Sequence, residues 1–144
     1  MIRVIALFIL TTQIVFADDC NSRSSAERIC KPETLEECQK YDNFGRGFCT
    51  NAIENKRNNE MQQAYEALLN KINRDKDQLV NAQEQWKEFI VAECGFQAAG
   101  AKTMNHAEQE TAYKTKVCLT KEYEARTEHL LKMQHYVNCA GCPQ

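Results

Sequence analysis

Two of the eight cysteines in this 144-residue chain, Cys139 and Cys142, have the C-x-x-C spacing of redox and metal sites. A thioredoxin-like function would need a βαβ context, and no stretch of the sequence alternates clearly as a strand. A zinc site would need two further ligands, but His129 and His135 are six residues apart and do not share one helical face well. We therefore interpret the C-x-x-C pair as a structural disulfide and predict no metal and no cofactor.

The sequence contains no motif of a known catalytic class. No nucleophile elbow, metalloprotease helix, phosphate-binding loop or dinucleotide fingerprint occurs in it. The acidic residues alternate with lysines along the chain, which is typical of a solvated surface. We predict that the protein is not an enzyme.

The first seventeen residues have the layout of a cleavable secretory signal. One basic residue, Arg3, precedes an apolar run that ends in Val-Phe-Ala. Cleavage near Ala17 would leave residues 18–144 as a single periplasmic or secreted domain without a membrane span. Residues 1–17 would then be the signal peptide.

The even number of cysteines in an exported chain indicates a disulfide framework. The cysteines are Cys20, Cys30, Cys38, Cys49, Cys94, Cys118, Cys139 and Cys142. The pairing of the first two and the last two stays open, because the C-x-x-C pair could close on itself or bond back to the N-terminal pair.

The net charge of the chain limits the class of partner. It is −2 for the whole sequence and −3 without Arg3, when 17 basic and 20 acidic side chains remain. A negative protein is a poor match for the phosphates of a nucleic acid. It favours instead a cationic protein partner, because opposite net charges speed encounter.

A long helix is expected over residues 52–94, since Ala52 to Glu93 contains neither proline nor glycine. Asn51 and Glu54 have the form of a capping box, and Gly95 would supply a helix stop. We expect short helices to start near Ser24 and near Pro32.

Apolar residues recur every seven positions in the long helix, which predicts one packed face. The two series are Tyr65, Ile72, Leu79 and Trp86, and Met61, Leu68, Ala82 and Phe89. The phase continues through the polar residues 73–77, which favours one continuous helix. A helical hairpin broken near Asp75 is the alternative.

A second long helix is expected from Asn105, with Glu108 three residues later. Its stripe consists of Ala112, Leu119, Tyr123, Arg126, Leu130, Met133 and Val137. Glu122 with Arg126 and Glu128 with Lys132 would add ion pairs along its surface.

A disulfide between Cys94 and Cys118 would bring the two stripes together. In antiparallel helices joined there, residues whose numbers sum to 212 face each other. The facing pairs are Phe89 with Tyr123, Trp86 with Arg126, Ala82 with Leu130, and Leu79 with Met133. The sequence therefore predicts an all-α, disulfide-stapled helical bundle with two long antiparallel helices and short N-terminal helices.

Arg126 is the polar member of its stripe. We interpret it as structural, with its guanidinium stacked on Trp86 or paired with a carboxylate. Trp86 and Tyr65 are likewise expected to belong to the core.

These residues resemble those of LprI-type lysozyme inhibitors, a family of small exported domains. The resemblance covers residues 38–131 and rests on Tyr65, the run Leu79…Ala82-Gln83…Trp86…Phe89…Cys94, then Cys118 and Arg126…Leu130. Two family cysteines about eleven residues apart match Cys38 and Cys49. The chain departs from the family pattern at Met61-Gln62, where the family has Leu-Asn, and at Ile90-Val91, where it has Arg-Asp.

The resemblance implies a protein that binds and inhibits a lysozyme-like cell-wall hydrolase. The alternative is an envelope interaction or immunity protein that binds another secreted protein and does not inhibit lysozyme. A lysozyme-like enzyme acts through two carboxylates in a cleft, so an ordered cation from the inhibitor could pair with them.

Two predicted loops could supply that cation. The first spans residues 42–48, contains Phe44, Arg46 and Phe48, and would be held by a bridge from Cys38 to Cys49. The second spans residues 95–104 and contains Lys102. The alternative interpretation is that both are plain surface turns.

Overall fold

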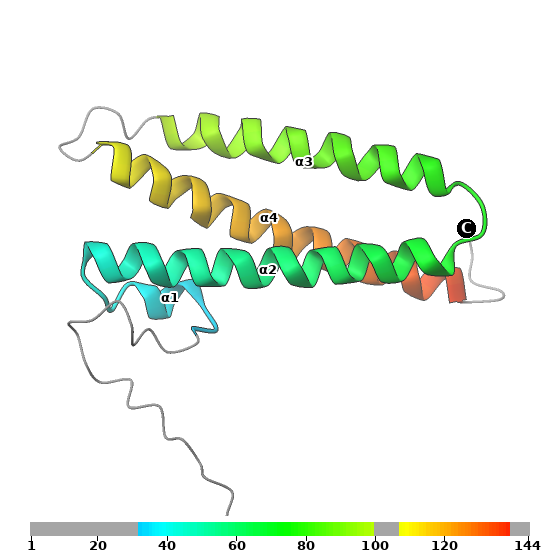
Figure 1. Ribbon diagram of the computed structural model, residues 1–144, viewed down its shortest axis with the longest axis horizontal. Helices are drawn as coiled ribbons and strands as arrows, with labels where there is room; N and C mark the ends of the chain where they lie inside the picture. The colour runs from blue at the N-terminus through cyan, green and yellow to red at the C-terminus, as the bar shows by residue number, and fades with distance from the viewer. Residues whose placement is uncertain (1–31, 100–106, 139–144) are drawn as a thin grey trace, which may run out of the picture.

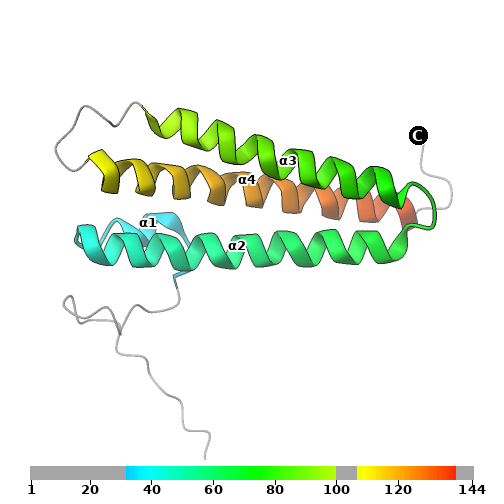
Figure 2. The ribbon, with the colours of Figure 1, turned by 45° about the horizontal axis from the view of Figure 1, so that its top comes forward.

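The protein is a bundle of three long helices with one short helix against it. The computed structural model describes residues 32–99 and 107–138, which contain helices and no strand. The helices are α1 (Leu35–Cys38), α2 (Asn43–Lys71), α3 (Lys76–Ala98) and α4 (Ala107–Asn138). Helices α2 and α3 form a hairpin, and α4 runs antiparallel to α3 and in the same direction as α2 (Figures 1 and 2).

The predicted all-α class and the two disulfides are confirmed. Cys38 bonds to Cys49 and Cys94 bonds to Cys118, with Cα–Cα distances of 5.4 and 5.5 Å. Helix α1 is the short helix expected near Pro32. The predicted signal segment and the helix start near Ser24 lie outside the described residues.

The single helix predicted over residues 52–94 is wrong, and the hairpin alternative is confirmed. Helix α2 ends at Lys71, and Asp75, just before α3, has a left-handed φ of 61°. Residues other than glycine seldom adopt this backbone conformation. The apolar pattern of the sequence does not indicate it, because Asp75 is polar. The seven-residue phase continues across the turn because α2 and α3 both pack against the same neighbour, α4.

Both predicted ends of that helix are also wrong. Helix α2 begins at Asn43, eight residues before Asn51, because the side chain of Asp42 caps it by accepting a hydrogen bond from the Gly45 N–H at 2.8 Å. Helix α3 continues through Gly95 to Ala98, which is buried, so packing against α4 extends the helix beyond the glycine.

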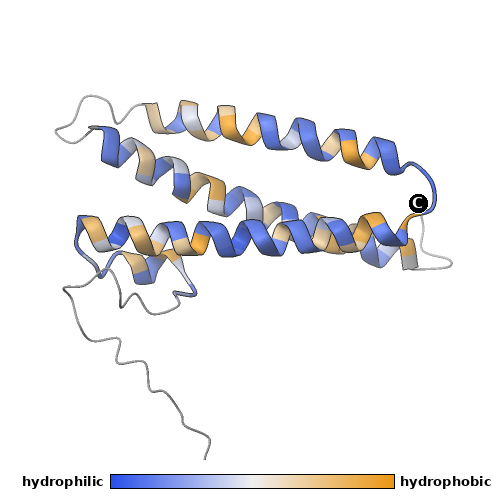
Figure 3. Cartoon of the chain, in the orientation of Figure 1, coloured by the Kyte–Doolittle hydropathy of each residue, from blue (hydrophilic) through white to orange (hydrophobic). Residues whose placement is uncertain are grey.

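The main core lies along α4 where the other two long helices meet it. It comprises Met61, Ala64, Leu68, Leu79 and Leu130, with Tyr65, Ile72, Trp86, Tyr123 and Met133 packed around them. Apolar and polar residues alternate along all three long helices, as expected for helices that each bury one side (Figure 3). Tyr65 and Trp86 are partly buried and pack against this core.

The predicted register of α3 on α4 is confirmed for two of its four facing pairs, Leu79 with Met133 and Trp86 with Arg126, and is wrong for the other two. Leu79 and Met133 belong to the same core. Phe89 is 62% exposed and Ala82 is exposed, so neither faces α4 as predicted. Trp86 takes the place of Phe89 and meets Tyr123 edge to face, with ring centroids 6.2 Å apart.

The face that α3 buries is centred one residue further along the chain than predicted. Gln83, Ile90 and Cys94 are buried there, while their neighbours in the predicted stripe point outward. A one-residue step turns a helix by about 100°, which moves the contact face to a different side.

A buried glutamine joins the three long helices. The side-chain amide of Gln83 lies 3.0 Å from the sulfur of Met61 on α2, to which it donates. Its carbonyl oxygen accepts a hydrogen bond of 2.9 Å from Nε of Arg126 on α4. The guanidinium of Arg126 also lies over the ring of Trp86, 5.3 Å from its centroid, so the predicted stacking is confirmed.

Burial between α3 and α4 shifts the pKa values of Arg126 and Tyr123. Burial lowers the pKa of Arg126, because the charged guanidinium loses water, and it raises the pKa of Tyr123 for the same reason, assisted by the negative charge of Glu54. In the described residues Arg126 forms no ion pair with Glu122, whereas the predicted pair of Lys132 with Glu128 is present at 3.9 Å.

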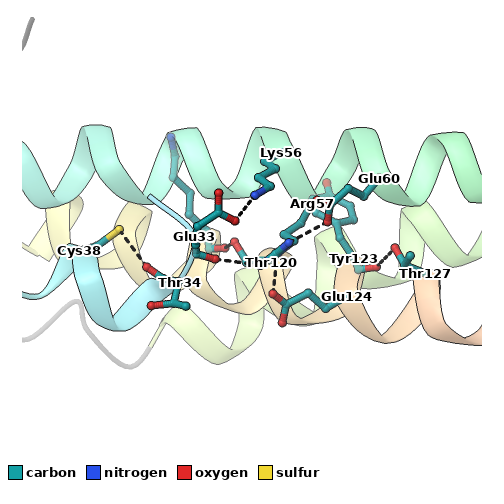
Figure 4. A network of polar contacts seen from close by, with 11 residues as sticks. Glu33, Thr34, Cys38, Lys56, Arg57, Glu60, Thr120, Tyr123, Glu124 and Thr127 are labelled. Atoms are coloured by element: carbon teal, nitrogen blue, oxygen red, sulfur yellow. Dashed lines mark hydrogen bonds and ion pairs between the residues drawn. The ribbon is translucent and has the colours of Figure 1, made fainter. Parts of the chain in front are cut away.

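Arg57 fastens the segment before α1 to the bundle (Figure 4). Its Nη1 lies 2.8 Å from Glu60 on the same helix, its Nε lies 2.7 Å from Glu124 on α4, and its Nη2 donates to the backbone carbonyl of Glu33 at 2.9 Å. The hydrogen bond to Glu60 is the main cause of the raised pKa of Arg57. The side chain of Glu33 pairs in turn with Lys56, which lowers the pKa of that carboxyl.

The bond between Gln83 and Arg126 predicts coupled effects on stability. Arg126→Met keeps the apolar stem but leaves the Gln83 carbonyl without its donor, and we expect the free energy of unfolding to fall by about 1–3 kcal/mol. Adding Gln83→Leu removes the stranded acceptor, so the double variant should be more stable than the sum of the two single losses by about 1 kcal/mol. Urea unfolding followed by fluorescence of Trp86, the single tryptophan, measures this, and strictly additive losses would contradict it.

Candidate functional site

A groove of about 770 Å³ opens between the first turns of α2 and α4. Helix α4 starts beside the end of α3 and approaches α2 along its length, so the two parallel helices are furthest apart where they begin (Figures 1 and 2). Its lining includes Phe44, Arg46, Phe48 and Asn51 from α2, and Tyr113 and Lys116 from α4. We refer to this hollow as the α2–α4 groove.

Two phenylalanines form one rim of the groove. Phe44 and Phe48 lie one helical turn apart and contact edge to face, with ring centroids 4.6 Å apart. Their exposed fractions are 65% and 45%. Aromatic side chains at this exposure beside a hollow are typical anchors of a protein interface.

Arg46 forms the opposite rim, and its guanidinium is held in place from two directions. The guanidinium carbon lies 4.7 Å from the centroid of the Tyr113 ring, and Nη2 donates a hydrogen bond of 2.9 Å to the side chain of Asn43. No carboxylate of the described residues lies within ion-pair distance of it. The remaining N–H donors of Arg46 can therefore bind an anionic group of a partner.

The second cation of the groove is already compensated. Lys116 donates to the side chain of Asn51 and lies 4.0 Å from the carboxylate of Glu54. Glu110, which also borders the groove, pairs with Lys114 at 3.8 Å. Of the two cationic side chains that line the groove, Lys116 has a carboxylate nearby, and Arg46 has none among the described residues.

Gly47 lies between these two rims on the helical wheel of α2. A Cβ added at Gly47 would meet nothing within 4 Å. The missing side chain therefore keeps the groove open between the phenylalanine pair and the arginine.

The bridge from Cys38 to Cys49 anchors the start of α2. The bridge and Ile53 are buried in a small second core, with Leu35 and Tyr41 packed against them. The hydroxyl of Thr50 donates to the carbonyl of Arg46 at 2.8 Å. The α2 side of the groove is therefore fixed covalently as well as by helical hydrogen bonds.

The sequence prediction for this site is right about proximity and wrong about conformation. Phe44, Arg46 and Phe48 do lie together, but they belong to the first turns of α2 rather than to a loop. The predicted second loop is helical as far as Ala98. Lys102 lies outside the described residues, so its role stays a prediction.

Sequence reasoning missed the α4 side of the groove. A single helix over residues 52–94 left α4 with only one partner, so no pattern placed Tyr113 or Lys116 beside the start of α2. The predicted helix cap, Asn51, lies inside α2 and accepts a hydrogen bond from Lys116.

Other predicted features concern residues that the structure covers only in part. Over residues 32–99 and 107–138, no cluster of histidine, cysteine, aspartate and glutamate side chains could hold a metal ion. In the same ranges no helix combines the length and apolar character needed to cross a bilayer. Cys20, Cys30, Cys139 and Cys142 lie outside the described residues.

Residues 38–130 match the family model described as lysozyme inhibitor LprI. This match covers most of the chain and includes both sides of the groove and both disulfides. The chain belongs to the LprI lysozyme inhibitor family. No curated protein and no solved structure matches the sequence.

Membership in the LprI family supports a protein partner, and the family consists of inhibitors rather than enzymes. Together with the two disulfides, it indicates an extracellular or periplasmic protein, because such bridges persist in oxidising compartments.

The open space at Gly47 predicts a stabilising substitution. Gly47→Ala should raise the free energy of unfolding by about 0.5–1 kcal/mol, because alanine loses less backbone entropy in a helix and the new methyl group touches nothing. Gly45→Ala is the matched control two residues away, where a Cβ would lie 3.0 Å from Tyr41 Cβ. Urea unfolding should show a gain for the first variant that the second does not equal, and a lower stability of Gly47→Ala than of the wild type would show that the space at Gly47 is not open.

Proposed function

We propose that this protein binds a lysozyme-like cell-wall hydrolase through the α2–α4 groove and inhibits it. The observation that carries the proposal is the positioned guanidinium of Arg46, which has no carboxylate partner among the described residues and lies opposite an exposed phenylalanine pair. The family match supports the activity, since it spans the segments that form the groove.

The chemistry of Arg46 suits the active site of such an enzyme. Glycoside hydrolases of this class act through a pair of carboxyl groups that flank the scissile bond. A guanidinium can bind a carboxylate through two parallel hydrogen bonds, which are stronger than bonds between neutral groups. An arginine that enters the cleft would therefore occupy the catalytic carboxylates and exclude the substrate.

The structure lowers the entropic cost of this contact. Stacking on Tyr113 and the bond to Asn43 already restrict the long side chain of Arg46, and the Cys38–Cys49 bridge fixes the helix that carries it. Binding energy is lost when flexible side chains must be ordered, so a pre-ordered arginine binds more tightly than a free one.

The phenylalanines would supply the apolar part of the interface. Phe44 and Phe48 project at the rim, where a partner surface can cover them and release water from both rings. The net negative charge of the chain would attract a cationic enzyme over longer distances, and this attraction weakens as salt is added.

Inhibition can be measured with purified hydrolases acting on cell-wall suspensions, by the rate of clearing. We expect stoichiometric slowing for at least one lysozyme-like enzyme, less at high salt, and a loss of affinity of about 10- to 100-fold for Arg46→Met. Arg74→Met is the matched control, because Arg74 is exposed in the turn at the opposite end of the bundle. Lys102→Met in the same assay tests the second predicted cation.

Absence of slowing across a panel of hydrolases at large molar excess of the folded protein would overturn the proposal. Equal loss of inhibition for Arg46→Met and Arg74→Met would show that the effect is one of overall charge and not of the groove.

The floor of the groove offers a test that leaves Arg46 intact. Gly47→Leu should fill the space between the two rims while keeping α2 stable, since leucine is a good helix former and the site is open. We expect inhibition to fall at least tenfold with no loss of thermal stability. Gly95→Leu is the control, because a Cβ at Gly95 also meets nothing within 4 Å and Gly95 does not line the groove. Full inhibition by the Gly47 variant would place the interface elsewhere.

A further inference from the structure

Helix α3 carries an apolar stripe that the bundle does not cover. Ala82, Phe89 and Phe96 recur at intervals of seven residues, so they lie on one side of the helix. Phe89 is 62% exposed and Phe96 is 78% exposed, the largest value among the exposed large apolar side chains of the described residues. The stripe lies about 100° round the helix from the buried face that contains Gln83 and Ile90.

We propose that this stripe binds the same stripe of a second copy of the chain, with the two α3 helices antiparallel. A two-fold axis at Phe89 would place that residue against its own copy. It would also place Phe96 of each chain opposite Ala82 of the other, so that a large side chain meets a small one at both ends. A surface that complements itself in this way is what an isologous dimer requires.

The parallel arrangement fits the same side chains poorly. It would bring Phe96 against Phe96 and Ala82 against Ala82, which crowds one end of the interface and leaves a gap at the other. Knobs-into-holes packing needs the apolar seam filled along its whole length. The distribution of side-chain sizes along α3 therefore selects the antiparallel pairing.

The area of the stripe sets the strength of the dimer. At roughly 200 Å² for a whole phenylalanine side chain, the exposed parts of Phe89 and Phe96 amount to about 280 Å² per copy. The two copies together would bury about 560 Å² through these rings, which is below the roughly 1,000 Å² of total area expected of a stable specific interface and in the range of weak, transient contacts. The association should be reversible and dependent on concentration rather than permanent.

The dimer would leave both α2–α4 grooves open. None of the stripe residues lines the groove, which is formed by α2 and α4. Self-association and hydrolase inhibition are therefore separate properties, and either can fail without the other.

Sedimentation velocity of the full exported chain over roughly 1–500 μM spans the affinities expected of a small interface. We expect the sedimentation coefficient to rise with concentration. Phe89→Glu should raise the dimer dissociation constant by at least about tenfold, because it brings two like charges together on the axis. Val91→Glu is the matched control: Val91 is also 62% exposed on the same helix, but it lies on the other side.

A charge swap tests the antiparallel orientation. Phe96→Lys alone should abolish association, and Ala82→Glu added to it should restore association, since each introduced lysine then faces a glutamate of the other chain. The two positions are about 21 Å apart within one helix, too far for a pair inside the same chain. In a parallel pairing the double variant would bring like charges together, and no restoration would occur.

A sedimentation coefficient that stays at the monomer value over the whole concentration range would overturn the proposal. This result is expected, for example, if another segment of the same chain covers the stripe. Equal loss for Phe89→Glu and Val91→Glu would also overturn it. Inhibition measured on Phe89→Glu separates the two proposals, because a monomer with an intact groove should still inhibit the hydrolase.

Discussion

Gln83 is the one described residue whose side chain bonds to both of the other long helices. It donates to Met61 on α2 and accepts from Arg126 on α4, and it is almost fully buried. A buried amide without partners would cost free energy, so this arrangement allows one rotation of α3 against its neighbours and disfavours others. The core around it is small, and apolar packing alone would specify the alignment of the helices less strictly.

The two disulfides hold parts of the helices that the hydrogen bonds of Gln83 do not reach. Cys94–Cys118 joins α3, near its end, to α4 about three turns after that helix begins, and Cys38–Cys49 joins α1 to the second turn of α2. The first bridge ties α3 to the helix that carries Tyr113 and Lys116, and the second holds the segment of α2 that carries Arg46. Both helices that line the groove are therefore covalently tied to a neighbour, whereas α2 and α3 are joined at the opposite end by a four-residue turn.

Helical periodicity and cysteine spacing predicted the fold class and the Cys94–Cys118 bridge, because both depend on local pattern; the family was indicated separately, by a resemblance to its residue motif. They favoured a continuous helix and left the turn at Asp75 as the alternative, because the left-handed conformation of that residue has no apolar signature. A continuous helix over residues 52–94 gives α4 only one long partner. The sequence therefore did not predict the contact of α4 with α2 or the position of Tyr113 and Lys116 beside it. Phe44, Arg46 and Phe48 were identified through their position between two cysteines, although the Asp42 cap makes that segment helical.

Hydrogen–deuterium exchange of the inhibitor, alone and bound to a hydrolase that it slows, tests the account most directly. Measured at one fixed inhibitor concentration, binding should protect the first turns of α2 (43–51) and of α4 (109–116), and leave the outer side of α3 unchanged. Protection confined to α3 or to the turn at residues 72–75, with none at the α2–α4 groove, would contradict it.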